Sequence, residues 1–229
     1  MTYIIAEIGI NHNGRLDLAL DLIDAAARAG ADAAKFQLFH MEHLKQYQLD
    51  EKQIAFLARA CHHRGIEFLC TPFDRQAVDF LTPLVSQFKI GSGQANDPDF
   101  VAYVVSKGLP VILSTGMSDV TKIRQVLDRM LGPFSLLHCV SLYPTPPEKA
   151  NLRRIDQLRY DFGCKVGYSD HTEGIDIALA AVALGAHIIE KHVTLDKTME
   201  GPDHRASITP DELRNLVIGA RNIEKALKH

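Results

Sequence analysis

The sequence lacks any apolar run long enough to cross a membrane. Its longest such runs, Ile4–Ala6 and Ile175–Leu184, are short or interrupted by charge, whereas a bilayer span needs about 20 apolar residues. The N-terminus enters a strand-like run at Tyr3, without the basic start, apolar stretch and small-residue cleavage site of a secretory signal. We therefore expect a cytoplasmic protein with no membrane partner.

An excess of one charge and paired cysteines are missing as well. The formal net charge is −3, which gives no electrostatic reason to expect a nucleic-acid partner. The cysteines are scattered and form no CxxC pair, at Cys61, Cys70, Cys139 and Cys164. In a chain without an export signal, this pattern predicts buried thiols rather than disulfides or zinc ligands.

No linker or short catalytic signature divides or labels the chain. There is no Gly/Ser-rich stretch, charge block, P-loop, GxGxxG or HExxH motif, and no Ser/His/Asp order stands out. At 229 residues, of which 46% are hydrophobic, the chain is long enough for one well-buried core and too short for two ordinary enzyme domains. We expect a single domain over residues 1–229.

What the sequence does contain is an alternation of short apolar runs with amphipathic stretches, typical of buried parallel strands and helices. Helical spacing from Leu16 ends at Gly30, and Thr209, Pro210 and Glu212 predict a capped start for the last helix. Eight such units in this length favour an α/β fold of the (β/α)₈ TIM-barrel type, although alternation alone leaves a doubly wound sheet open. Strands are expected to begin near Tyr3, Asp32, Ile66, Phe88, Pro110, Phe134, Cys164 and His187.

Polar side chains occupy the ends of all eight expected strands. In a TIM barrel the carboxyl ends of the strands meet at one mouth, where catalytic groups gather. Because an unpaired charge is costly to bury, a cluster of this kind implies an anionic ligand or a metal. The residues in chain order are Glu7, Lys35, Gln37, Thr71, Lys89, Ser92, Ser114, Thr115, His138, Tyr143, Ser169, Asp170, His171, Glu190 and His192.

Two features of this set indicate ligand chemistry. Lys35 and Lys89 suit a phosphate or carboxylate, helped by nearby hydroxyls and by Gly91–Gly93, which otherwise reads as a simple tight turn. His171 and His192 follow consecutive strands and could bind a divalent metal such as Mn²⁺, Co²⁺ or Fe²⁺ as neutral imidazoles. Their spacing matches no short metal motif, so this prediction depends on the barrel.

Several motifs together resemble the N-acetylneuraminate (sialic acid) synthase family and its legionaminic and pseudaminic relatives. The resemblance covers nearly the whole chain in order, so the set is far more specific than any one motif. The segments that carry it are Ile5–Gly14, Ala34–Gln37, Thr71–Asp74, Phe88–Gly93, Ile112–Met117, His138–Pro146, Gly167–Thr172, Glu190–His192 and Gly201–His204.

The resemblance implies a transferase on a TIM barrel that condenses phosphoenolpyruvate with an open-chain N-acyl amino sugar and releases phosphate. It implies Mn²⁺, with Co²⁺ or Mg²⁺ as alternatives, held by His171 and His192. Glu7, Gln37 and Asp203 would contact the sugar, and Glu7, Lys35, Lys89, Gln94 and Asp170 would take part in catalysis. Phosphoenolpyruvate would be bound by Lys35, Thr71, Lys89, Ser92, Ser114, Ser141, Tyr143 and Ser169.

The sequence departs from the family pattern at three points. Gln94 stands where the family usually has a glutamate, and a glutamine cannot accept a proton as a carboxylate does. The connection from Phe39 to about Gln53 is short, and the family's C-terminal antifreeze-like domain has no counterpart in this sequence. We therefore expect a smaller or different acceptor than N-acetylmannosamine, or a homo-oligomer or separate partner protein that completes the acceptor pocket.

Two other functions remain open from the sequence. A metal-dependent aldolase or lyase on the same barrel would use pyruvate without releasing phosphate, and Gln94 favours it. A non-catalytic ligand-binding relative is the other alternative, against which stand both lysines and both histidines. The fold alone cannot decide, because barrels of this type support many chemistries.

Overall fold

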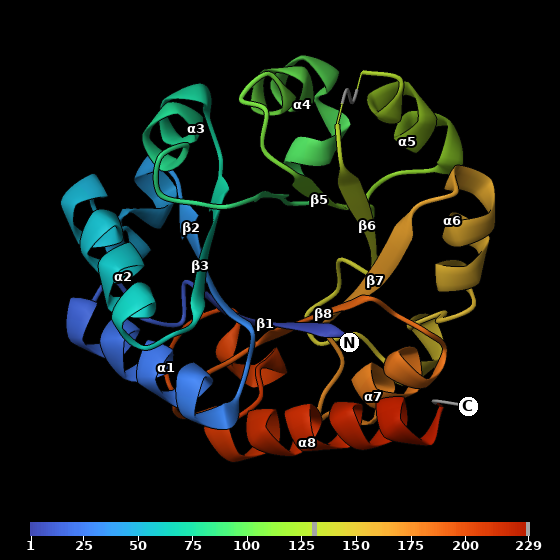
Figure 1. The fold of residues 1–229 in the computed structure, drawn as a ribbon. Coiled ribbons are helices and arrows are strands. Elements are labelled where there is room, and N and C mark those ends of the chain that lie inside the picture. Colours follow the sequence, from blue (N-terminus) through green and yellow to red (C-terminus); the bar gives the residue numbers. More distant parts are fainter. Residues whose placement is uncertain (130–131, 228–229) are drawn as a thin grey trace.

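Eight parallel strands surrounded by helices form the molecule in a computed structural model, which describes residues 1–129 and 132–227 (Figure 1). The strands begin within one residue of the positions expected from the sequence. They are β1 (Tyr3–Gly9), β2 (Ala33–Leu38), β3 (Glu67–Pro72), β4 (Phe88–Ile90), β5 (Val111–Ser114), β6 (Phe134–Cys139), β7 (Lys165–Asp170) and β8 (Ile188–His192).

A helix follows each strand and packs on the outside of the sheet (Figure 1). The helices are α1 (Leu16–Ala29), α2 (Glu51–His63), α3 (Arg75–Leu81), α4 (Pro98–Val105), α5 (Val120–Leu127), α6 (Arg154–Phe162), α7 (Asp176–Ala183) and α8 (Pro210–Ala226). None of the helices within the described ranges is long and apolar enough to cross a membrane.

The strand order is β3-β2-β1-β8-β7-β6-β5-β4, so the first and last strands of the chain pair with each other. Within the described residues, β3 and β4 are neighbours without a hydrogen-bonded ladder. The sheet is therefore a nearly closed barrel, which confirms the expected TIM-barrel class and excludes a doubly wound sheet.

The two helix boundaries that the sequence specified form as expected. Gly30 caps α1 in the left-handed conformation at φ 84°, which glycine adopts without steric cost. At the start of α8, Thr209 and Glu212 form a reciprocal capping box ahead of Pro210. Arg221 of α8 donates to the carbonyl oxygen of Thr2 at 2.6 Å, which ties this last helix to the start of β1.

The interior of the barrel is layered. Apolar side chains from six strands fill its middle, namely Ile5, Ala33, Leu69, Ile112, Leu137 and Ile188. Because side chains alternate between the two faces of a strand, the next inward position in each strand lies one layer nearer the carboxyl end. On β1, β2 and β8 those positions carry Glu7, Lys35 and Glu190. The apolar layer therefore forms the floor of a polar mouth.

Candidate active site

A cavity of about 290 Å³ opens at the carboxyl ends of the strands. It brings together every residue that was assigned a catalytic, binding or metal role except Asp170 and Asp203. Of the other strand-end residues expected at the mouth, Thr115 and His138 do not line it; their side chains contact the carbonyl oxygens of Leu137 and Ala150 instead. The predicted residues that line it are Glu7, Lys35, Gln37, Thr71, Lys89, Ser92, Gln94, Ser114, Ser141, Tyr143, Ser169, His171 and His192. Phe73, Gly91, Gly93, Met117, Cys139 and Glu190 complete the lining.

Lys35 and Lys89 lie at the bottom of the cavity, only 3% and 2% exposed. Lys35 Nζ is 2.8 Å from Glu7 Oε2 and donates to Thr71 Oγ1 at 3.2 Å. Lys89 Nζ donates to Ser114 Oγ at 2.8 Å. Two buried ammonium groups thus face the same space from β2 and β4.

Glu190 joins these two lysines. Its Oε2 lies 3.5 Å from Lys35 Nζ and 3.6 Å from Lys89 Nζ, while its Oε1 accepts from Ser169 Oγ at 2.9 Å. Burial would raise the pKa of Glu190, but the two lysines outweigh it and lower that pKa to about 2. The sequence placed Glu190 among the polar strand ends but assigned it no catalytic or binding role, although its position two residues before His192 puts both side chains on the same face of β8.

Glu7 and Glu190 act on the lysines in return. Burial alone would lower the pKa of Lys35, but Glu190 and Glu7 outweigh it and the pKa is raised. For Lys89 the balance is the opposite: burial lowers its pKa by more than Glu190 raises it, so the pKa of Lys89 is lowered. The cluster therefore holds two positive and two negative charges that balance one another.

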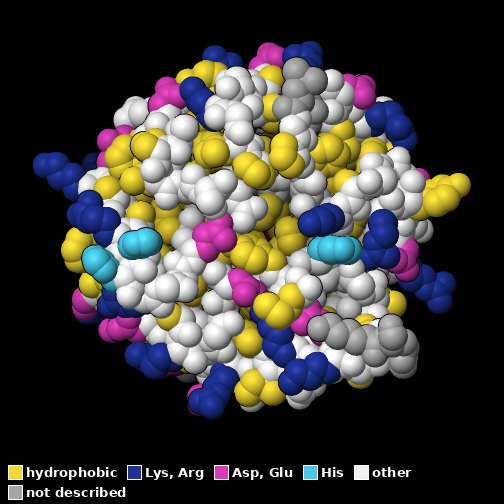
Figure 2. Space-filling view, in the orientation of Figure 1, with side chains coloured by type: hydrophobic (Ala, Val, Ile, Leu, Met, Phe, Trp, Pro, Cys, Tyr) yellow, Lys and Arg dark blue, Asp and Glu magenta, His cyan; other side chains and the backbone are white. Residues whose placement is uncertain are grey.

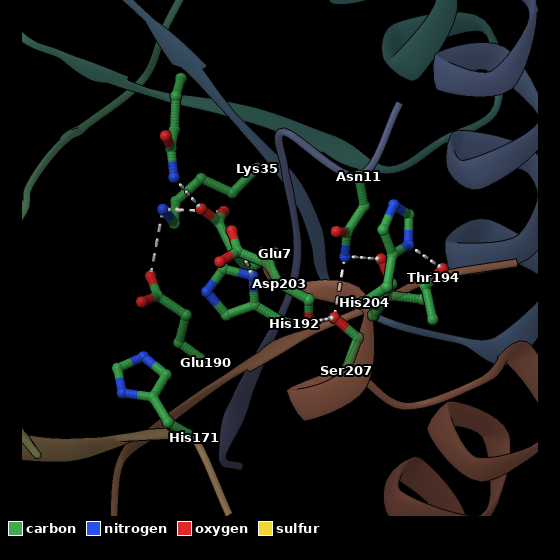
Figure 3. Close-up of polar contacts among 12 residues, drawn as sticks. Glu7, Asn11, Lys35, His171, Glu190, His192, Thr194, Asp203, His204 and Ser207 are labelled. Atoms are coloured by element: carbon green, nitrogen blue, oxygen red, sulfur yellow. Dashed lines mark hydrogen bonds and ion pairs between the residues drawn. The ribbon is translucent and has the colours of Figure 1, made fainter. Parts of the chain in front are cut away.

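His171 and His192 lie near each other at the ends of β7 and β8, with ring centroids 5.7 Å apart (Figure 3). The ring of Tyr143 lies 4.1 Å from that of His171. His171 Nδ1 is 2.7 Å from the carbonyl oxygen of Val140, which leaves Nε2 available as an acceptor. Burial, and then His192, lower the pKa of His171 to about 4. His171 is therefore neutral near pH 7, as a metal ligand must be.

Gln94 begins a single 3₁₀ turn, Gln94–Asn96, after β4. A Cβ atom added to Gly91 would lie 2.9 Å from Gln94 Oε1, so the amide folds back over the glycine turn. Ser92 Oγ accepts from the backbone amide of Gly116 at 3.1 Å and lies 3.1 Å from Cys139 Sγ. Burial raises the pKa of the Cys139 thiol, so this cysteine is a neutral wall of the cavity.

Asp203 lies beside the cavity, on the segment that follows β8. Its Oδ2 is 3.7 Å from His192 Nδ1, a buried nitrogen that has no hydrogen-bond partner among the described residues (Figure 3). Ser207 Oγ donates to the carbonyl oxygen of Asp203 at 2.7 Å, and Asn11 Nδ2 donates to Ser207 Oγ at 2.8 Å. This chain of contacts fixes the Asp203 segment to the loop after β1, a link that the sequence analysis did not identify.

Asp170 points away from the cavity. Ser169 and His171 line it, and because side chains alternate along a strand, Asp170 between them faces the surrounding helices. There it pairs with Lys191 at 2.8 Å, both side chains being fully buried. The predicted catalytic role would require contact with the reacting molecules, and this position offers none.

The comparisons with known proteins agree on one family. A model described as the NeuB family matches residues 40–229. The N,N'-diacetyllegionaminic acid synthase of Legionella pneumophila is 40% identical over 98% of this chain and 73% of its own length. The human N-acetylneuraminate-9-phosphate synthase is 39% identical over 98% of this chain and 71% of its own length.

A solved structure gives the same result in three dimensions. The N-acetylneuraminic acid synthetase of Leptospira borgpetersenii, crystallised with citrate, superimposes with a TM-score of 0.96 and 39% sequence identity. The match covers 100% of this chain and 85% of that one.

Proposed function

The chain belongs to the NeuB family of phosphoenolpyruvate-dependent synthases, and on that premise we propose that it joins phosphoenolpyruvate to an aldehyde sugar. The product would be a sialic-acid-like 2-keto-3-deoxy acid, with phosphate released. The acceptor would be an N-acylmannosamine or a smaller aldose. No nucleic acid is expected as a partner, and the face drawn in Figure 2 has Lys and Arg interspersed with Asp and Glu rather than gathered into one basic patch.

The observation that carries this proposal is the pair of buried lysines at the bottom of one cavity. A dianionic phosphate and a carboxylate on the same small molecule would satisfy both ammonium groups, which are otherwise neutralised only by Glu7 and Glu190. The hydroxyl-rich wall adds hydrogen-bond donors. We assign phosphoenolpyruvate binding to Lys35, Thr71, Lys89, Ser92, Ser114, Ser141, Tyr143 and Ser169.

The two histidines fit a divalent metal. His171 has the backbone partner that orients metal-binding imidazoles, and His192 has a buried nitrogen without a hydrogen bond. No group of three or more His, Cys, Asp or Glu side chains in the described part of the chain is placed to bind an ion. The protein would therefore supply two imidazoles, and water or substrate oxygens the remaining ligands. We propose Mn²⁺, with Co²⁺ or Mg²⁺ as alternatives.

When bound, the metal would supply Lewis-acid polarisation of the aldehyde oxygen. Carbon 3 of phosphoenolpyruvate would attack the aldehyde carbon, which opens the carbon–oxygen double bond and leaves positive charge at carbon 2. The aldehyde oxygen takes up one proton, which balances the proton lost by the water that adds at carbon 2. Water adds at carbon 2, and the resulting tetrahedral intermediate expels phosphate. Lys35 and Lys89, already fixed by Thr71 and Ser114, would stabilise charge on the leaving phosphate without reorganising.

The water-addition step needs a proton acceptor, and the amide of Gln94 cannot be one. Two carboxylates line the cavity, and the lysines make Glu190 a poor base because they lower its pKa to about 2. We therefore propose Glu7, which accepts from Gln37 at 3.0 Å and pairs with Lys35. A phosphate oxygen of the substrate itself is the other acceptor available. Glu7, Gln37 and Asp203 would also contact the acceptor sugar.

The mouth offers an apolar surface to a partner. Met117, Leu142 and Tyr143 are 58%, 43% and 47% exposed, and Met117 and Tyr143 line the cavity. A second copy of the chain or a separate protein that covers these side chains would bury apolar surface and complete the acceptor side.

The test is phosphate release from phosphoenolpyruvate with Mn²⁺ across a panel of aldoses and N-acylmannosamines. Aldehyde-dependent release that disappears in His171→Ala is the expected result. A pyruvate-dependent reaction without phosphate release would instead indicate an aldolase, the alternative that Gln94 favours. Failure of every aldehyde, despite tight binding of phosphoenolpyruvate, would contradict the proposal for this chain. Gln94→Glu would then show whether the missing carboxylate is the cause.

A further inference from the structure

The ion pair between Asp170 and Lys191 is fully buried, and the proposed reaction does not use it. Both side chains are 0% exposed, and Lys191 Nζ is 2.8 Å from Asp170 Oδ2. The same ammonium group donates to the carbonyl oxygen of Thr172, and Asp170 Oδ1 accepts from the Thr172 amide at 2.9 Å. Two contacts of Lys191 thus join β8 to the end of β7 behind the cavity wall, and the third holds Asp170 against Thr172 within that end.

The strand register places this pair directly between two pairs that face the cavity. Ser169 lies opposite Glu190, and Asp170 lies opposite Lys191. One residue further along each strand come His171 and His192. Side chains alternate with a period of two, so Asp170 and Lys191 point away from the cavity. Asp170 immediately precedes His171 in the chain, and Lys191 immediately precedes His192.

Lys191 contacts the residues on both sides of His171. It binds the side chain of Asp170, which precedes His171, and the carbonyl group of Thr172, which follows it. Lys191 itself precedes His192. The ammonium group of Lys191 therefore links the chain segment that carries His171 to the strand that carries His192.

Stability alone does not account for such a pair, since a buried ion pair can often be replaced by apolar side chains without loss of stability. Its contacts are directional, however, and they act on residues adjacent to the candidate metal ligands. We propose that Asp170 and Lys191 are positioning residues that set the spacing of His171 and His192, and with it the affinity for a divalent cation. This inference rests on the metal site of the proposed function.

The test measures binding of Mn²⁺ alone to the full chain by titration calorimetry or electron paramagnetic resonance. Asp170→Asn, Lys191→Met and the double variant should each bind Mn²⁺ at least about tenfold more weakly, because a displaced ligand weakens the site. The visible spectrum of the Co²⁺-loaded protein should also change, since it reports ligand geometry. Binding of inorganic phosphate, whose charge the proposal assigns to Lys35 on β2 and Lys89 on β4, should stay within about twofold.

Leu57→Ala is the matched control, because Leu57 is fully buried on α2 and far along the chain from β7 and β8. It should lower thermal stability and leave Mn²⁺ affinity unchanged. If the single variants fail to fold because one charge is left unpaired, the double variant decides. A folded double variant with wild-type Mn²⁺ affinity and Co²⁺ spectrum overturns the proposal.

Two further outcomes are also decisive. If no variant of the pair folds, Asp170 and Lys191 are required by the fold itself, and the positioning role is overturned. If the wild-type chain binds Mn²⁺ no better than His171→Ala, the metal site of the proposed function fails and the inference fails with it. The wild-type titration therefore separates the two kinds of failure.

Discussion

Single residues set the charge of the cavity. Lys35 and Lys89 are each held by a carboxylate and a hydroxyl, so the site is balanced before any ligand arrives. An incoming anion must compete with Glu190, which lies within 3.6 Å of both ammonium groups. The residue that links the lysines therefore also limits how tightly they can bind a substrate.

Glu190→Gln should strengthen binding of phosphoenolpyruvate by roughly tenfold, because it removes one negative charge beside the anion site. The amide keeps the size of the side chain and its contact with Ser169. Titration calorimetry with phosphoenolpyruvate would measure the change, with Glu200→Gln on the surface as the control. Weaker binding in Glu190→Gln would instead show that the carboxylate is needed to hold the lysines in place.

His12 makes stability depend on pH. It is buried beside Phe36, and burial lowers its pKa to about 4 from the usual 6.5. Between these values the unfolded chain binds more protons than the folded one, so stability is lost as pH falls from 6.5 towards 4. The shift corresponds to a loss of about 3 kcal/mol from this residue.

Urea unfolding at pH 7 and pH 4.5 would test this prediction. In His12→Asn the side-chain oxygen can still accept the hydrogen bond that Gly14 donates to His12 Nδ1, but no group titrates. The variant should be less stable at pH 7 and should lose less stability on acidification. An unchanged pH dependence would mean that other buried histidines account for the effect.

At the scale of elements, local chemistry fixes where each helix and strand begins, and alternation fixes which side chains face the cavity. The capping box of α8 and the glycine cap of α1 were evident in the sequence because each involves only nearby residues. Alternation along β7 likewise implied that Ser169 and His171 share a face and that Asp170 does not. The prediction of a catalytic role for Asp170 rested on the resemblance to the family and did not take the alternation of side chains along β7 into account.

The cap of α8 should have a measurable effect on stability. Thr209→Ala should lower the free energy of unfolding by about 1 kcal/mol, because the Glu212 amide loses its acceptor. Thr209→Ser keeps the hydroxyl and serves as the control, with nearly wild-type stability. Urea unfolding measures both, and equal stability of the two variants would contradict the role of the cap.

At the scale of the whole molecule, the barrel divides the mouth between two tasks. The lysines come from β2 and β4, whereas His171 follows β7 and His192 ends β8. Glu190 bridges the two sides. We propose residues 1–229 as one domain, in which the same closure of β1 on β8 that completes the barrel brings Glu7 and His192 into register.

This division predicts the effect of metal removal. Treatment with a chelator should abolish aldehyde-dependent phosphate release, and added Mn²⁺ should restore it. Binding of phosphoenolpyruvate should change by no more than about threefold, because the lysines bind it without the histidines. Calorimetry on the metal-free and Mn²⁺-loaded chain would measure this. Loss of phosphoenolpyruvate binding with the metal would show that the donor site includes the ion.

The sequence by itself determined the alternating elements, the caps, and the polar residues at every strand end, because each of these depends on side chains that are close in the chain. The tertiary structure alone decided that Glu190 lies between two lysines and that Asp203, on a segment tied to Asn11, lies near His192. It also decided that β3 and β4 meet without a ladder in the part of the chain that the structure describes. These features depend on strand register and barrel closure, which join residues far apart in the chain and leave no local pattern.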